Sequence, residues 1–411
     1  MYGKKIAITL LLGISCTALQ AQYLQDIYRF SQPDRGATAR FKALGNAQTA
    51  LGGDLSSIAG NPAGLGFFSQ SDIGLSIDYV NDANNSTYFG ENSRYNVDKF
   101  GFNQIGIVLH NPIHRARGSN LTEGWLNFNI GISYNKTNTF NSTVGFSGIN
   151  SENSISDFMA YEAYTQGNIY GDFGWDAGLI DQRPVNGQYE YVAMTMLDNA
   201  QRITNRETGY QAETNISFGA NYSNRLYIGA GLGFARINHD VNYLFREEGT
   251  METYGYIFSM NPRSRFVDNT NTEYDVYNPL LESDYVYENE YWSTTTGNGF
   301  NAKLGLIYKP VQYFQLGISA VSPTWYRLRN DYEDYFGITN YLTDGGTSDF
   351  ESEGEPTYFD YRYRSPYRIN GGVAAIFEQG LISVDVEYVD YAGMYFSSID
   401  SQTDENMNRQ I

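Results

Sequence analysis

Cysteine is nearly absent from this 411-residue chain, since Cys16 is the only one. A single cysteine provides no disulfide framework and no cysteine-based metal site. No apolar run reaches the roughly 18 residues of a membrane-crossing helix, which excludes a helical membrane protein. Basic residues are also scarce, with 27 Lys and Arg against 46 Asp and Glu, so a nucleic-acid binder is excluded by the lack of a basic footprint.

Charged residues of either sign are few, whereas aromatic residues and glycine are abundant. Charged residues make up 18% of the chain, below the roughly 25% of an average soluble domain. The chain has 36 Tyr, 24 Phe and 42 Gly. This composition predicts an all-β protein with a lipid-facing surface.

Residues 1–21 have the parts of a secretory signal peptide. A basic pair and an apolar run, residues 4–14, precede a small-residue cleavage site that ends at Ala21. The position three residues before Cys16 is glycine, where a lipoprotein signal needs a leucine-like residue, so lipidation is disfavoured. We expect an exported protein whose mature chain begins at Gln22.

Apolar and polar residues alternate in nine segments. In the third of them Phe128 and Ile130 fall on one face, and Asn127 and Asn129 on the other. Apolar-out, polar-in alternation over about ten residues is typical of a transmembrane β-barrel. A soluble sandwich also alternates, but its inner faces need bulkier residues than Gly and Asn. The segments are residues 73–79, 105–109, 125–135, 215–222, 226–234, 300–308, 314–320, 367–377 and 382–388.

Short and long connections alternate between these segments, which is the organisation of barrels with short periplasmic turns and long external loops. The short ones are residues 223–225, 309–311 and 378–380, with the moderate link 111–122 in a short-turn place. The long ones are residues 81–99, 137–210, 245–291 and 330–357. We therefore predict a transmembrane antiparallel β-barrel.

The segment before the first strand has a helical pattern instead. Asp54 is placed to cap one short turn, and Asn61 to cap another that has Pro62 in its first position. A compact helical piece that precedes a barrel folds most simply into its lumen. We expect a luminal plug over residues 22–69 and the barrel over residues 70–411.

This plug segment resembles the hatch of the FadL/TodX transporters of hydrophobic compounds. The resemblance rests on the run from Ala39 to Asp54 and on the family's Asn-Pro-Ala motif, which falls on Asn61, Pro62 and Ala63. Residues 365–374 and 384–391 are similar to the family's late hairpins. The long loops carry no resemblance.

The resemblance implies a monomeric fourteen-stranded barrel in the outer membrane of a Gram-negative bacterium, in contact with its lipid and lipopolysaccharide. It implies that external loops capture hydrophobic ligands, which leave sideways into the membrane through a kinked wall strand. The hatch residues expected to gate this route are Asn61, Pro62, Ala63, Gly64, Phe67 and Phe68.

The strand count departs from the family pattern. About nine strands are present, an odd number, and residues 397–411 are a polar run without a terminal aromatic strand. Unpaired edge groups in lipid cost several kcal/mol each. We therefore expect an incomplete barrel with open edges near residues 73–79 and 381–391, and further strands in a longer native chain.

The ligand and its site are weakly indicated. Aromatic loop residues are candidates for an apolar pocket, although an aromatic girdle or loop packing explains any one of them equally well. With three histidines, haem capture by histidine has little support, and a tyrosine ligand stays open. A fatty-acid-like or aromatic ligand is also open. The candidates are Phe158, Tyr161, Tyr254, Tyr256 and Phe258.

No motif indicates an enzyme, a metal site or a cofactor. Phe234 takes the place of the third glycine of a dinucleotide loop. Pro112 prevents His110 and His114 from sharing a helix face. The acidic stretch 331–360 lacks a calcium-loop pattern and is expected to be a solvated external loop.

Two functional classes remain. The first is a passive channel for hydrophobic small molecules. The second is a barrel of the same family that binds proteins through its external loops, like the PorV-like subunits of a secretion complex.

Overall fold

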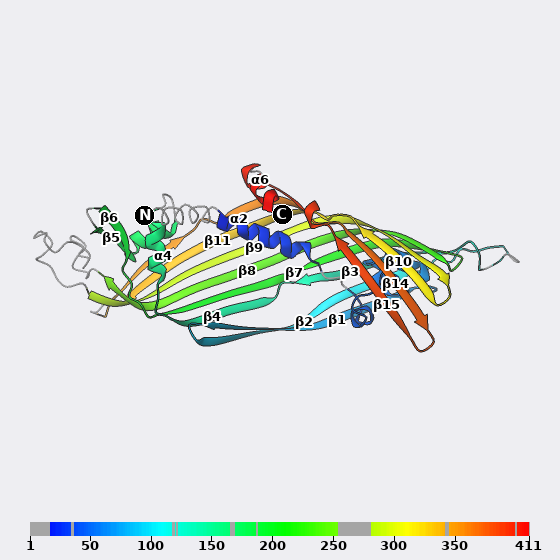
Figure 1. The fold of residues 1–411 in the computed structure, drawn as a ribbon, viewed down its shortest axis with the longest axis horizontal. Coiled ribbons are helices and arrows are strands. Elements are labelled where there is room, and N and C mark those ends of the chain that lie inside the picture. Colours follow the sequence, from blue (N-terminus) through cyan, green and yellow to red (C-terminus); the bar gives the residue numbers. More distant parts are fainter. Residues whose placement is uncertain are drawn as a thin grey trace, which may run out of the picture.

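The computed structural model describes residues 17–33, 37–116, 120, 122–164, 169–185, 188–253, 281–341, 345–398 and 401–410. Its main feature is one 14-stranded antiparallel sheet of long strands, with short helical segments at several places along it (Figure 1). No helix in these ranges is long and apolar enough to cross a membrane.

Nine strands form the continuous path of this sheet, and each contains one of the nine alternating segments. The nine predicted strands are therefore confirmed, but the predicted count of about nine is too low, because five further strands belong to the same 14-stranded sheet. In spatial order they are β1 (Asp72–Tyr88), β2 (Glu91–Leu109), β3 (Trp125–Thr139), β7 (Asn199–Tyr222), β8 (Leu226–Thr253), β9 (Leu281–Val311), β10 (Phe314–Val321), β14 (Arg368–Phe377) and β15 (Gly380–Val389).

Where the predicted long loops are described, much of their length is strand instead, because the strands continue far past the alternating segments; residues 254–280 of the third loop lie outside the described residues. β1 and β2 stay paired up to Tyr88 and Glu91, and β8 and β9 up to Thr253 and Leu281. In the extension of β8 the outward residues become polar, as at Arg236, Asn238 and Asp240, whereas inward residues such as Ile237 and Met251 are apolar and buried. The apolar-out alternation therefore reverses while the backbone ladder continues.

Further strands lie in the two other predicted loops, including the acidic stretch 331–360, and in the chain that follows them. They are β4 (Ser142–Asn150) on β7, β11 (Trp325–Tyr341) on β9, β12 (Thr347–Glu353) and β13 (Thr357–Arg364) on β11, and β16 (Tyr395–Ser397) on β13. A separate hairpin consists of β5 (Ile180–Val185) and β6 (Gln188–Ala193).

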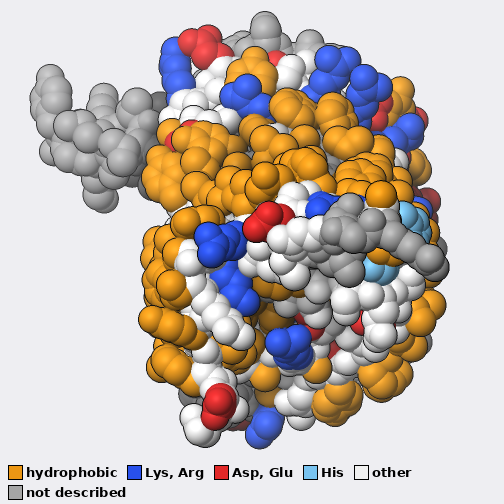
Figure 2. All heavy atoms as spheres, turned by 90° about the vertical axis from the view of Figure 1, so that its right-hand side faces the viewer, with side chains coloured by type: hydrophobic (Ala, Val, Ile, Leu, Met, Phe, Trp, Pro, Cys, Tyr) orange, Lys and Arg blue, Asp and Glu red, His pale blue; other side chains and the backbone are white. Residues whose placement is uncertain are grey.

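Side-chain polarity in the sheet is the reverse of that in a soluble protein. Large apolar residues such as Leu232 and Phe234 are exposed on the outer face, whereas Asn129, Asn215 and Ser217 are buried on the inner face. On β8 the outward apolar residues extend over residues 226–234, close to the about 9–11 residues of a bilayer-spanning strand. An end view shows apolar side chains around the outside and polar groups toward the interior (Figure 2).

The helical segments fall into three groups. On the inner face lie α2 (Thr17–Ser31), α3 (Ala39–Ala43) and the 3-10 helices η1 (Leu55–Ile58) and η2 (Pro62–Phe67); the expected cleavage position before Gln22 lies within α2. Farther along the same face, α4 (Ile155–Glu162) and α5 (Ile169–Asp176) pack against Tyr285 and Tyr287 of β9. The C-terminal segments are η4 (Tyr391–Gly393) and α6 (Ser401–Gln410), and Met407 of α6 packs in one cluster with Phe30 of α2. The C-terminal polar run is thus mostly helix.

The sheet curves around the segment of residues 37–68, which we call the plug. Leu55 of the plug lies against Gly74 of β1, and Gln48 and Thr49 donate backbone N–H groups to Asp385 of β15. The two ends of the strand path therefore contact the same plug. Within the described ranges no ladder joins β1 to β15, in agreement with the expected open edges.

Candidate functional site

Two polar side chains fix the turns of the plug. Asp54 accepts a hydrogen bond from the Ser56 N–H at 2.8 Å and one from the Thr38 hydroxyl at 2.9 Å. The Asn61 side chain accepts from the Ala63 N–H at 3.1 Å. Both predicted caps are confirmed, although the turns they cap are 3-10 helices rather than α-helices.

Asn61 has a second role, which its position in the motif does not reveal. Its amide Nδ2 donates to the carbonyl of Thr49 at 2.6 Å and to that of Ile318 in β10 at 3.4 Å. The side chain is 1% exposed. One residue therefore connects two segments of the plug to the wall.

Inward-facing glycines provide the space into which the plug fits. A Cβ at Gly229 would lie 2.2 Å from the Pro62 carbonyl carbon, and one at Gly305 would lie 1.8 Å from the Asn61 side-chain oxygen. Only glycine, which has no side chain, permits the backbone of the plug to approach a strand this closely. We call these residues the glycine belt: Gly74, Gly106, Gly131, Gly219, Gly229, Gly305, Gly317 and Gly372, one on each of eight strands.

Polar wall residues satisfy the backbone of the plug. Asn129 donates to the Leu65 carbonyl at 2.6 Å, and Ser217 donates to that of Ile58 at 2.6 Å. Lys303 donates to the carbonyl of Ala59 at 2.9 Å. The Asn and Ser face of the strands, which the alternation assigns to the lumen, is therefore the face that binds the plug.

The structure brings the six predicted hatch residues together in the lumen. Pro62, Ala63 and Gly64 are buried in η2. The Phe67 ring stacks on that of Tyr227 with centroids 3.8 Å apart, and Phe68 is buried in a cluster with Leu55, Ile58, Leu65 and Val108. Their gating role stays a proposal.

Beside the plug, regular strand structure in the wall is interrupted at three places. These three places lie next to each other, at the same height on neighbouring strands. Residues 322–324 separate β10 from β11, residues 365–367 separate β13 from β14, and residues 390–394 separate β15 from β16. Pro323 and Pro366 have no N–H to donate to the ladder. We call these three interruptions the break row; below it β14 stays paired with β10 and β15 with β14 (Figure 1).

Hydroxyl groups replace part of the missing ladder at the break row. The N–H of Ala302 donates to Ser322 Oγ, and the N–H of Thr324 donates to Ser365 Oγ, both at 2.9 Å. The N–H of Ser365 in turn donates to the carbonyl of Thr324 at 3.0 Å. Side-chain hydroxyl groups therefore take the place of some backbone acceptors at this level.

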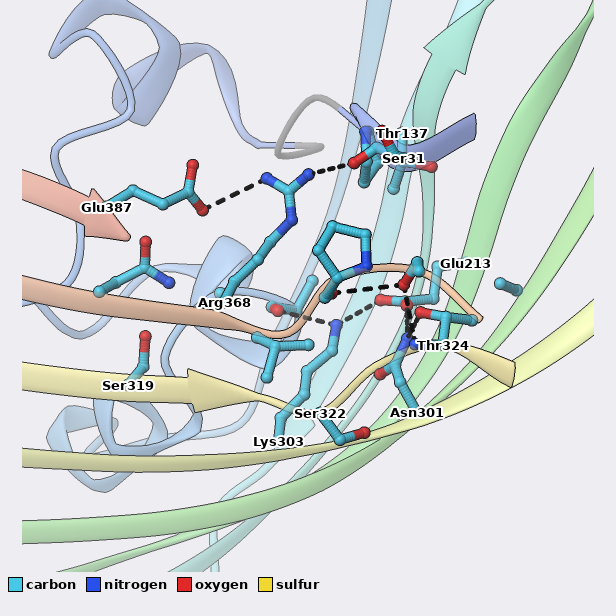
Figure 3. A pocket seen from close by; sticks show the side chains of 18 of the residues that line it. Ser31, Thr137, Glu213, Asn301, Lys303, Ser319, Ser322, Thr324, Arg368 and Glu387 are labelled. Atoms are coloured by element: carbon cyan, nitrogen blue, oxygen red, sulfur yellow. Dashed lines mark hydrogen bonds and ion pairs between the residues drawn. The ribbon is translucent and has the colours of Figure 1, made fainter. Parts of the chain in front are cut away.

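A cavity of about 100 Å³ lies between the break row and the plug. Two charged pairs line it (Figure 3). Lys303 forms an ion pair with Glu213, and Arg368 lies between Glu387, at 3.4 Å, and the Ser31 carbonyl, at 2.5 Å. Apolar groups, among them Phe30, Val321 and Pro366, line part of the cavity, and most of its remaining lining is uncharged and polar.

Three amides that line the cavity retain hydrogen-bonding capacity. Both side-chain polar atoms of Gln48, the Oε1 of Gln211 and the Oδ1 of Asn301 have no hydrogen-bond partner among the described residues, although all three residues are buried. An unsatisfied buried polar atom costs free energy. These atoms therefore favour a bound water or the polar end of a solute.

Charged groups hold α2 against the wall. Arg29 lies 3.2 Å from Asp26 and 3.1 Å from Glu207, and His239 lies 3.2 Å from Glu207. Burial raises the pKa of Asp26 to about 6, against the opposing charges of His239 and Arg29. The docked helix therefore holds a proton on Asp26 more tightly than a released helix would.

The predicted ligand residues are dispersed. Phe158 and Tyr161 lie on α4 with exposed side chains, while the buried face of that helix carries Met159 and Ala160. Tyr254, Tyr256 and Phe258 lie outside the described residues. A ligand role for these five aromatic residues stays a prediction.

Sequence reasoning missed the charged pairs of the cavity. Lys303 lies in a predicted strand, on the face opposite Ala302 and Leu304, so its parity alone indicates a lumen-facing cation. Arg368 and Glu387 become neighbours only through the pairing of β14 with β15. Among the described residues, no cluster of three His, Cys, Asp or Glu side chains is arranged to hold a metal ion.

No family model and no curated protein sequence matches this chain. Among solved structures, it is similar to the crystal structure of the P. putida toluene transporter TodX, with 14% sequence identity and a TM-score of 0.40. The similarity covers 89% of this chain and 74% of the TodX chain.

Proposed function

We propose that this protein is an outer-membrane channel for the passive uptake of hydrophobic small molecules, fatty-acid-like or aromatic. The observation that supports it best is the break row, where the wall loses regular pairing next to a cavity and a plug. A plugged lumen allows no continuous aqueous path. A solute that reaches the cavity therefore has a shorter route sideways than through the plug.

Physical chemistry favours this lateral route for an apolar solute. Moving from the cavity through the wall brings the solute to the exposed apolar band, so it does not have to cross the aqueous space beyond the plug. Phe30, Val321 and Pro366 offer apolar contacts inside the cavity, and the Gln48 amide offers a polar one. This combination suits a molecule with an apolar body and a small polar end.

A disulfide across the break row tests the lateral exit. In the double variant Thr324→Cys with Ser365→Cys, the new thiols are placed where the two segments contact each other. Cys16, in the expected signal peptide, is the only native cysteine, so no native thiol competes in a mature chain beginning at Gln22. We expect the oxidised variant to lose at least four-fifths of the uptake of radiolabelled oleate or toluene by a host lacking its own channel, and a reductant to restore it.

A disulfide on an uninterrupted part of the ladder is the matched control. Asn238 and Thr296 face each other on β8 and β9, and their Cys pair should leave uptake unchanged in both redox states. Equal uptake by the oxidised and reduced break-row variant would exclude this exit.

Protein binding is a second candidate, favoured by the length of the strands. β9 has 31 residues, about three times what a bilayer requires, so much of its sheet lies beyond the apolar band. Such a sheet offers a large polar surface to a protein partner. Native mass spectrometry of the purified protein separates the two functions, because a co-purified apolar ligand supports uptake and a stoichiometric subunit supports assembly.

A further inference from the structure

The apolar band on the outer face ends, on the side away from the short turns, in two successive rows of residues. One row is mainly aromatic and the next contains arginines. The first row is aromatic: Phe234 faces Phe300, which faces Trp325 across β8, β9 and β11. It continues to Arg364 on β13 and to Tyr395 on β16. Aromatic residues at the rim of an apolar band are typical of the membrane interface.

The next outward row contains three arginines. Arg236 faces Asn298, which faces Arg327, which faces Arg362. All three arginine side chains are exposed. Directly opposed residues in an antiparallel sheet are about 5 Å apart. We call Arg236, Arg327 and Arg362 the arginine row.

The arginine row lacks neutralising partners. None of its members forms an ion pair with a carboxylate in the part of the chain that the structure describes. The next row outward holds Arg329, which is already paired with Asp331 at 2.9 Å. A concentration of unpaired cations is unusual on a chain of net charge −19. It indicates an anionic partner at this level.

A groove connects the arginine row with the aromatic row. It has a volume of about 740 Å³, and its lining includes Phe300 and Trp325 on one side and Arg327 and Arg362 on the other. Arg364 lies between the two kinds of residue, with its guanidinium 5.6 Å from the centre of the Tyr395 ring. The groove therefore offers apolar contacts toward the band and guanidinium groups beyond it.

We propose that this groove binds a phosphate-bearing lipid of the outer leaflet, of the lipid A class. Its acyl chains would lie along the apolar band, and its phosphates would accept hydrogen bonds from Arg327 and Arg362, with Arg236 at the side. The planar guanidinium group binds phosphate through two parallel hydrogen bonds. The inference rests on the band lying in the outer membrane, as the proposed function also requires.

Native mass spectrometry of the full mature protein in detergent, titrated with bis-phosphorylated lipid A, tests the proposal. We expect the triple variant Arg236→Gln, Arg327→Gln, Arg362→Gln to bind at least tenfold more weakly than the wild type. The matched control Arg94→Gln, Arg202→Gln, Arg206→Gln removes the same charge from other exposed positions and should bind as the wild type does. Dephosphorylated lipid A should bind the wild type at least tenfold more weakly.

Three results would overturn the proposal: undiminished binding by the triple variant, equal binding of dephosphorylated lipid A, or displacement of the lipid by an equal concentration of inorganic phosphate. Heat-modifiable gel mobility verifies that each variant is folded. If the triple variant does not fold, Arg327→Lys keeps the charge but removes the planar fork, and a several-fold loss is expected. The binding readout does not involve uptake, so its outcome is independent of the break-row disulfide.

Discussion

Asn61 shows how one side chain performs two structural functions at once. Its carbonyl oxygen caps η2 through the Ala63 N–H, and its amide group joins Thr49 to β10. The cap follows from local sequence, since Asn before Pro at a helix start is a familiar pattern. The second set of bonds exists only because the plug is seated in the wall.

Replacement of Asn61 should loosen the plug without unfolding the wall. Asn61→Ala leaves the Ala63 N–H and the Thr49 carbonyl without their partner, at a cost of about 1–3 kcal/mol. Hydrogen exchange of the η2 amides should accelerate roughly 5- to 150-fold, while the β8 and β9 amides stay protected. Asn61→Asp keeps the acceptor but places a buried carboxylate oxygen against the Thr49 carbonyl, so it should loosen the plug at least as much as Asn61→Ala. Unchanged exchange in Asn61→Ala would exclude the anchoring role.

At the scale of elements, the strands that contact the plug have glycine, which lacks a side chain, where the plug lies against them. Across the glycine belt, Gly219 faces Gly229 and Gly229 faces Gly305, so three neighbouring strands present bare backbone at one level. The plug turns lie directly against this backbone. Gly229 is therefore part of the surface on which the plug packs, whereas Gly231 and Gly233 lie against the wall side chains of Ser217 and Glu213.

A single methyl group on the glycine belt should displace the plug. In Gly229→Ala the new Cβ would meet backbone atoms of Pro62 and Ala63 at 2.2 and 2.4 Å, which cannot move aside as a flexible side chain would. Overpacking of this kind costs about 1–3 kcal/mol. We expect faster proteolysis of the plug in folded protein.

The matched control is Gly371→Ala on β14. No atom lies within 4 Å of a Cβ at this position, so the plug should be as resistant as in the wild type. Equal proteolysis of the two variants would contradict a seating role for the belt.

At the scale of the whole molecule, the apolar band has an aromatic rim at each end. Trp125 packs against Tyr222 near the short turns, and Trp325 packs against Phe300 at the far rim. Trp292 lies eight residues beyond Phe300 on β9, and Trp175 lies on α5. The four tryptophans of the chain therefore divide into two at the rims and two beyond the band.

Brominated lipids should distinguish these two pairs. In proteoliposomes, the variant Trp175→Phe with Trp292→Phe retains the rim tryptophans, and lipids brominated near the headgroup should quench most of its fluorescence. The complementary variant Trp125→Phe with Trp325→Phe should be quenched little. Similar quenching of both would show that the exposed apolar band is not the membrane-facing surface.

The sequence alone determined the nine strands of the main path and the two caps of the plug. Both depend on near neighbours: alternation within one strand records which face points outward, and a cap joins residues two positions apart. In the extensions of β8 and β9 the outward face is polar and the inward face is partly apolar, so the apolar-out pattern does not continue there. The sequence pattern therefore predicts loops where the structure has strands.

Only the tertiary structure decided the features on which the proposals rest. The break row forms because interruptions at residues 322–324, 365–367 and 390–394 come to the same level. Arg236 and Arg362 are 126 positions apart in the sequence. In the sheet, Arg362 lies on the strand next to that of Arg327, and Arg236 lies two strands from Arg327 on the other side. Such alignments are set by the register between strands, which depends on hydrogen bonds and packing along the whole sheet rather than on the pattern within any one segment.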